Sequence, residues 1–277
     1  RLHRGELPRT SLPEGGVVSD TLDQIRADGY ERVIAVMLSS GLSGTYNMVR
    51  LQAGQRDDLE IAVFDSRSGS LGIGIMVLQL WEEIVAGASW ETLVRERAPH
   101  LVANTFPFFS VDTLEYLRRG GRIGRITALA GTMLSIKPVM HVDDEGHLTK
   151  VGTARGRNAS LKALVDHMAE TAIDPAGQTV FISHGDCEED ANKVAEDVKR
   201  RFGVQTVVLN NVGPVIAPTP ARAPWPCSSW GGTADGGREV AGSDPGHHRG
   251  GAGRPVRPAH RQRVTGLAIE DEEDFKT

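Results

Sequence analysis

One short segment of this chain concentrates the small hydroxyl side chains with which a protein can bind an anion. Residues 38–46 read LSSGLSGTY, after the apolar run 33–38 and before a helix-compatible stretch. Its hydroxyl side chains are those of Ser39, Ser40, Ser43 and Thr45. Backbone N–H groups at a helix start and the helix dipole attract anions, and hydroxyls add uncharged donors. The segment therefore predicts a site for a carboxylate or phosphate, with a plain helix cap and tight turn as the alternative.

The first hundred residues contain the alternating pattern that would position such a turn. Strands are expected at 33–38 and 61–64, because both are short apolar runs, and the first is typical of a strand buried on both faces. Helices are expected at 22–27, 43–53, 71–85 and 90–97. Strands that alternate with helices predict a parallel α/β sheet.

From residue 105 the order of elements changes. Residues 106–111 read as a strand that Pro107 would confine to a sheet edge or a strand start. Two strands, 136–142 and 147–153, surround a turn at 143–146 and predict a hairpin. The other expected elements are helices at 112–119, 160–172 and 187–202 and strands at 180–183 and 206–209. We therefore predict a second, α+β domain over 105–216, following an α/β domain over 1–104.

Composition limits the class of protein further. The chain has 277 residues and a net charge of -5, which gives no general field for binding nucleic acid. The two cysteines, Cys187 and Cys227, stand in unrelated contexts and indicate neither a disulfide framework nor a zinc site. No apolar run approaches the ~20 residues of a membrane span, and no signal-peptide pattern opens the chain. A cytoplasmic protein without a membrane span is the expectation.

Several motifs, taken together in order, resemble the DegV family, the fatty-acid-binding subunits of bacterial fatty acid kinases. The most specific is VDTLEYLRRGGRIG at 111–124, and LSSGLSGTYN at 38–47 supports it. The others are PRTSLP at 8–13, DSRSGSLG at 65–72, SIKPV at 135–139, ARGR at 154–157, SHGD at 183–186 and NVGPVI at 211–216.

The resemblance implies a fold and a role. It implies two α/β domains with a ligand tunnel between them, in which a long-chain fatty acid lies with its carboxylate held by hydroxyl groups. On this chain those hydroxyls would be Thr10 and Ser43, with Ser39, Ser40 and Thr45 alongside. The protein would have no catalytic activity, metal or cofactor of its own. It would present the fatty acid to the catalytic subunit of a fatty acid kinase, which makes the acyl phosphate.

The arginine-rich motifs have two interpretations. They could contact the kinase or the phosphate being transferred, or they could form an ordinary solvated charged face. The residues concerned are Arg118, Arg119, Arg122, Arg155 and Arg157.

Both ends of the chain differ from the family pattern. Arg1 falls well inside that pattern, so the first domain is expected to be incomplete. After residue 216 the composition changes, although the resemblance implies a His-Thr-Gly-Pro-Gly motif and an apolar closing strand there. A shifted reading of the codons from Pro218 permits that ending. We predict a change of reading frame near codon 217, which makes 217–277 a disordered tail without the closing strand; the DNA sequence tests this.

Two other functions stay open. The hydroxyl-rich segment could be the anion site of a small-molecule enzyme, although GLSGT is not a nucleophile elbow and the sequence contains no P-loop. The chain could also be a non-functional fragment of a family member.

Overall fold

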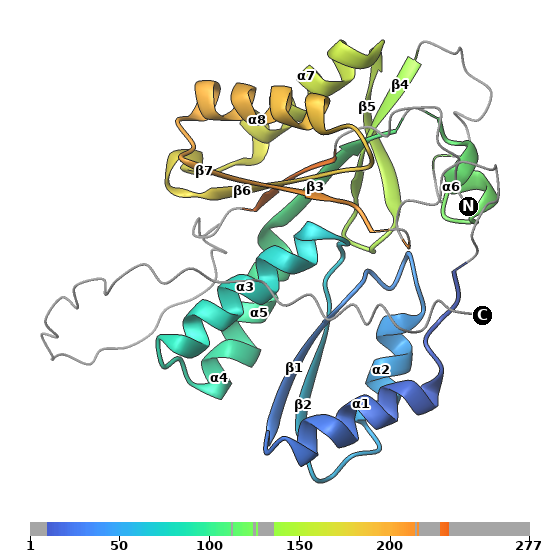
Figure 1. Ribbon diagram of the computed structural model, residues 1–277, viewed down its shortest axis with the longest axis vertical. Coiled ribbons are helices and arrows are strands. Elements are labelled where there is room, and N and C mark those ends of the chain that lie inside the picture. Colours follow the sequence, from blue (N-terminus) through green and yellow to red (C-terminus); the bar gives the residue numbers. More distant parts are fainter. Residues whose placement is uncertain are drawn as a thin grey trace, which may run out of the picture. The chain divides into compact units, whose positions relative to one another are not determined.

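The computed structural model describes residues 10–111, 113–123, 126, 136–213, 215 and 228–232 (Figure 1). These residues belong to the compact unit Arg1–Gly237, and the unit Arg238–Thr277 lies outside the described residues. Most of the predicted tail therefore lies outside them as well.

The first half builds a small parallel sheet. Strand β1 (Arg32–Met37) pairs in parallel with β2 (Glu60–Asp65), from Arg32 opposite Glu60 to Met37 opposite Asp65. The helices are α1 (Gly15–Ala27), α2 (Thr45–Ala53), α3 (Leu71–Val85), α4 (Trp90–Thr92) and α5 (Ala98–Asn104), with a π-helical turn at Leu93–Arg97 between the last two. This arrangement confirms the predicted parallel α/β first half.

The second half builds a mixed sheet in the order β5-β4-β3-β8-β6-β7. Its strands are β3 (Thr105–Ser110), β4 (Ile136–Val142), β5 (Leu148–Arg155), β6 (Thr179–His184), β7 (Thr206–Asn211) and β8 (Ser228–Gly232). Its helices are α6 (Glu115–Arg119), α7 (Arg157–Thr171) and α8 (Glu188–Phe202), with a 3-10 turn at Pro175–Gly177. Strands β4 and β5 form the predicted antiparallel hairpin, and β6 pairs in parallel with β7.

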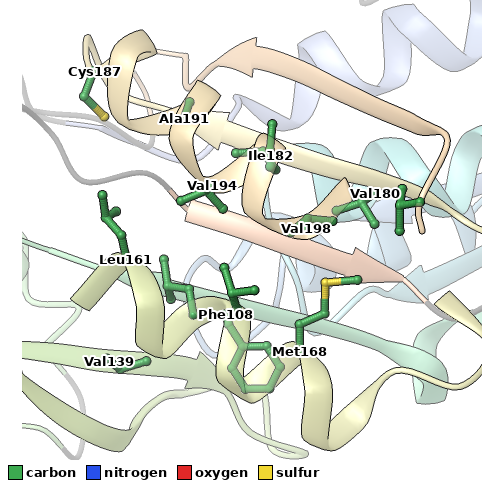
Figure 2. Packing of buried hydrophobic residues seen from close by; sticks show 14 residues of the cluster. Phe108, Val139, Leu161, Met168, Val180, Ile182, Cys187, Ala191, Val194 and Val198 are labelled. Atoms are coloured by element: carbon green, nitrogen blue, oxygen red, sulfur yellow. The ribbon is translucent and has the colours of Figure 1, made fainter. Parts of the chain in front are cut away.

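The main core lies where α7 and α8 pack on this second sheet (Figure 2). Ile182 of β6, Leu164 of α7 and Val198 of α8 are fully buried there, and Phe108 of β3 joins them. A smaller core around Met76, Leu80 and Leu101 packs on the first sheet. Among the described residues, no helix combines the length and the apolar character that crossing a membrane requires.

The closing strand is where the structure differs most from the sequence prediction. We expected no strand after residue 216, yet β8 pairs antiparallel with β3 on one side and β6 on the other. Main-chain hydrogen bonding does not depend on side-chain identity, so two open strand edges can accept a segment of almost any sequence. The predicted change of reading frame is untouched by this result and stays a prediction.

The boundaries of several elements also differ. Helix α1 begins at Gly15, well before the expected residue 22, and α2 begins at Thr45, after the expected residue 43. Strand β3 is an interior strand, so of the two positions predicted for Pro107 the sheet edge is wrong and the strand start is confirmed. Pro107 is tolerated because it lies near the strand start, before pairing with β4 begins at Phe108.

Candidate functional site

Two turns lie side by side because they follow neighbouring parallel strands. Strands β1 and β2 end in register at Met37 and Asp65, so the segments after them leave the same edge of the sheet. We call residues 38–45 the hydroxyl turn and residues 66–70 the serine turn. The Ser39 N–H donates to the Ser68 carbonyl at 2.9 Å, and the Ser40 N–H donates to Asp65 Oδ1 at 3.1 Å. These bonds join the two turns into one structure.

The hydroxyls of the hydroxyl turn fall into two groups. Ser43 Oγ and Thr45 Oγ1 lie 2.8 Å apart at the start of α2, both half-buried, and Ser43 Oγ also accepts from the Thr45 N–H at 3.3 Å. Ser39 is fully buried, and its Oγ donates to the Gly146 carbonyl at 2.7 Å. Ser40 is half-buried. Ser43, Thr45 and Ser40 can therefore meet a ligand, whereas Ser39 anchors the turn.

The anchor partner of the hydroxyl turn is the hairpin between β4 and β5. A Cβ atom added at Gly41 would lie only 2.4 Å from the Gly146 carbonyl oxygen, so the two backbones are in direct contact. Gly146 itself has a φ of +82°, which favours glycine. Gly41 of LSSGLSGTY is thus required by a contact between segments more than a hundred residues apart.

The arginine-rich motif also reaches the hydroxyl turn. The Arg122 Nε donates to the Leu42 carbonyl at 3.2 Å, while the Leu42 side chain packs against the cluster that contains Ile123 and Leu148. The structure therefore brings together the two motifs on which the family resemblance mainly rests.

The other predicted site residues are placed less centrally. Thr10 is exposed, and no hydrogen bond joins it to Ser43. Its segment does reach the turn, because a Cβ at Gly44 would lie 3.3 Å from the Leu12 side chain. Thr10 can therefore be near the hydroxyl turn, but the structure does not join the two.

The remaining arginines differ in their surroundings. Arg118, Arg119 and Arg155 are exposed on the surface. Arg157 instead donates from its Nε to Asp190 Oδ2 at 2.8 Å, and both side chains are mostly buried. A contact between Arg157 and a partner would have to compete with this ion pair.

Burial raises the pKa of the Cys187 thiol to about 11, more strongly than the nearby Arg157 lowers it. The residue stands at the start of α8. Its thiol stays protonated near neutral pH and is therefore unreactive.

The serine turn was missed as a site by sequence reasoning. Ser70 has φ 50° and ψ -133°, and Arg67 has φ 49°, so two non-glycine residues adopt strained backbone conformations within four positions. Ser70 Oγ lies 3.2 Å from Ser183 Oγ at the end of β6. A signal was available, because DSRSGSLG repeats the pattern of a strand, a small hydroxyl-rich turn and a helix.

Three buried polar atoms near these strand ends have no hydrogen-bond partner among the described residues. They are Ser68 Oγ, Ser110 Oγ and His184 Nδ1. Ser110 and His184 end β3 and β6, the strands on either side of β8. Such atoms are rare in native structures unless a water or ligand pairs with them.

Comparison of the sequence with known protein families identifies the family of this chain. The family model DegV, described as an uncharacterised protein of the DegV family, matches residues 1–218. The chain belongs to the DegV family, so the motif-based resemblance and the two-domain DegV-like fold class are confirmed. The match ends next to the position where we predict the change of reading frame.

Individual relatives agree with this assignment. The DegV domain-containing protein CPE2509 of Clostridium perfringens is 37% identical over 193 residues, which are 70% of this chain and 68% of the relative. A fatty-acid-binding DegV family protein of Thermus thermophilus has a TM-score of 0.70 at 28% identity, covering 80% of this chain and 79% of that one. The fatty acid kinase B3 protein of Streptococcus pneumoniae, loaded with linoleic acid, has a TM-score of 0.69 at 20% identity, covering 81% and 78%.

Proposed function

We propose that this chain binds a long-chain fatty acid and holds its carboxylate at the start of α2. The observation that carries the proposal is the Ser43–Thr45 hydroxyl pair, half-buried at a helix N-terminus. Within the pair one hydroxyl donates to the other, so the second is left to donate to a carboxylate, and the helix dipole favours negative charge there. The fatty acid binding described for the Thermus thermophilus relative supports the same assignment.

The energetics suit a fatty acid. Each buried CH₂ group contributes ~0.8 kcal/mol, so a long acyl tail contributes on the order of 10 kcal/mol before the costs of association. The head group then needs only orientation, which uncharged hydroxyls supply. Because no salt bridge holds the carboxylate tightly, one of its oxygens stays nucleophilic enough to attack ATP.

We further propose that the chain presents the bound fatty acid to a partner kinase and has no catalytic activity of its own. The Streptococcus pneumoniae protein of the same fold is part of a fatty acid kinase. Arg118, Arg119 and Arg155 are exposed and positively charged, which suits contact with a kinase or with the transferred phosphate. Arg122 would add its charge beside the hydroxyl turn. A cytoplasmic bacterial protein follows from the same proposal.

The experiment is native mass spectrometry of the purified full chain. A co-purified acyl chain is expected, with the mass of a long-chain fatty acid. If no acyl chain is found and added fatty acid does not bind either, the proposal is wrong. Charge reversal at Arg118 should then weaken acyl-phosphate formation by an added kinase subunit while leaving fatty-acid binding unchanged.

One observation favours the enzyme alternative. Residues 68–72 read SGSLG, and Ser70 lies between β2 and α3 with the strained backbone of a nucleophile elbow. However, its hydroxyl lies beside the Ser183 hydroxyl, and within the described ranges no histidine or carboxylate is hydrogen-bonded to it. A serine without a base is a weak nucleophile, so fatty-acid binding is the better supported function.

A further inference from the structure

Three fully buried serines in or next to the joined turns differ in whether their hydroxyls are hydrogen-bonded. Ser39 Oγ donates to the Gly146 carbonyl, and Ser66 Oγ accepts from the Ser68 N–H at 3.1 Å and donates to the Ser68 carbonyl at 3.2 Å. Ser68 Oγ is equally buried but has no partner among the described residues. Burial alone therefore does not explain an unpaired hydroxyl, since its two neighbours are both paired.

The backbone of Ser68 is held firmly in place. Its N–H is bound by Ser66 Oγ, and its carbonyl accepts from both Ser66 Oγ and the Ser39 N–H. Because both backbone groups are engaged, Ser68 cannot move to solvent without breaking the contact between the turns. A buried hydroxyl in such a rigid place, without a partner in the described part of the chain, destabilises the ligand-free protein.

The position of this hydroxyl relates it to the proposed ligand site. The Ser68 carbonyl is bonded to Ser39, which lies four residues before Ser43 in the hydroxyl turn. On either side of Ser68, the strained Arg67 and Ser70 keep the serine turn in its unusual conformation. Strain and an unpaired polar group that persist together are typical of places prepared for a ligand.

We propose that Ser68 is a further specificity-determining residue, whose Oγ donates a hydrogen bond to the head group of the bound fatty acid. This inference rests on the proposed function. The serine turn would then belong to the same site as the hydroxyl turn. Hydroxyls that follow both β1 and β2 would orient the carboxylate. An uncharged donor of this kind suits a singly charged carboxylate.

The test compares Ser68→Ala with Ser66→Ala in the full chain, using linoleic acid as the probe. Ser68→Ala should weaken binding by about 10- to 100-fold, as expected for losing a hydrogen bond to a charged group. It should leave the ligand-free melting temperature unchanged or higher, because it removes an unpaired buried hydroxyl. Ser66→Ala should lower that melting temperature, because it removes both bonds to the Ser68 backbone.

The outcomes separate this inference from the proposed function. If the unmodified chain does not bind linoleic acid, both are overturned. If it binds, and Ser43→Ala weakens binding while Ser68→Ala does not, only the role of Ser68 is overturned. A Ser68→Ala variant that melts as low as Ser66→Ala would also overturn it, since the hydroxyl would then have a structural partner. If alanine prevents folding, Ser68→Cys gives the same comparison, because a thiol is a poor donor.

Discussion

The interior strand β6 of the second sheet is buried far more deeply than either strand of the first sheet. In β6 of the second sheet, five of the six residues are buried, whereas in β2 of the first sheet none is. Parallel strands are normally covered on both faces, so the first sheet is unusually open as far as the described residues go. The proposed ligand site stands on that open sheet and is anchored to the hairpin of the other. Binding sites tend to use such regions of low local stability.

The largest expected effect comes from breaking the contact between the two regions. Gly41→Ala would push a Cβ atom into the Gly146 carbonyl, where only 2.4 Å is available. We expect a loss of about 3 kcal/mol in the free energy of unfolding, typical of severe overpacking, together with loss of fatty-acid binding. Denaturant unfolding measures the first and equilibrium binding the second.

Gly16→Ala is the matched control for that variant. Gly16 lies in α1, and an added Cβ there meets nothing within 4 Å. Because alanine favours helix, this variant should be as stable as the parent or up to about 1 kcal/mol more stable. Equal destabilisation by both changes would show that the contact between the hydroxyl turn and the hairpin does not matter.

A pair of identical substitutions compares the two sheets themselves. Val180 of β6 is 1% exposed, and Val63 of β2 is half-buried. Val180→Ala should cost about 2 kcal/mol and Val63→Ala about half of that, since less apolar surface is lost. If Val63→Ala costs as much as Val180→Ala, the first sheet is better covered than the described residues show.

The smallest expected effect concerns pH and belongs to the second sheet. Burial, and to a lesser degree the charge of His167, lowers the pKa of His141, although Asp143 and Asp144 oppose the shift. The ring also stacks on Phe108, with centroids 6.1 Å apart. A histidine whose pKa is lower in the folded protein binds more protons when unfolded, so stability should fall as pH drops below about 6.5.

His141→Gln checks the source of that pH dependence. The glutamine variant cannot titrate, so its melting temperature should change less between pH 7 and pH 5 than that of the parent. If both proteins show the same pH dependence of the melting temperature, titratable groups other than His141 cause the loss of stability at low pH.

The sequence predicted the elements of the proposed site better than it predicted the contacts that hold those elements in place. Apolar runs and a hydroxyl-rich turn are local patterns, so the strands β1 and β2 and the candidate residues Ser43 and Thr45 could be identified from them. The interior position of β3 could not, because it depends on pairing with strands far along the chain.

The hydrogen bonds that hold the proposed site in place also join residues far apart in the sequence. The bonds from Ser39 to Gly146 and from Arg122 to Leu42 join segments about 80 to 107 positions apart. The Ser68 hydroxyl is likewise invisible in the sequence, since it is defined by the lack of a hydrogen-bond partner among the described residues. These features depend on tertiary packing, which local patterns do not encode.

The most direct test of the central claim compares a fatty acid with its methyl ester. The ester keeps the acyl tail but has no charged carboxylate, so the unmodified chain should bind linoleic acid at least tenfold more tightly than methyl linoleate. In a Ser43→Ala/Thr45→Ala variant that preference should largely disappear, while ester binding stays unchanged. If the variant keeps the full preference for the acid, the hydroxyl turn does not hold the carboxylate.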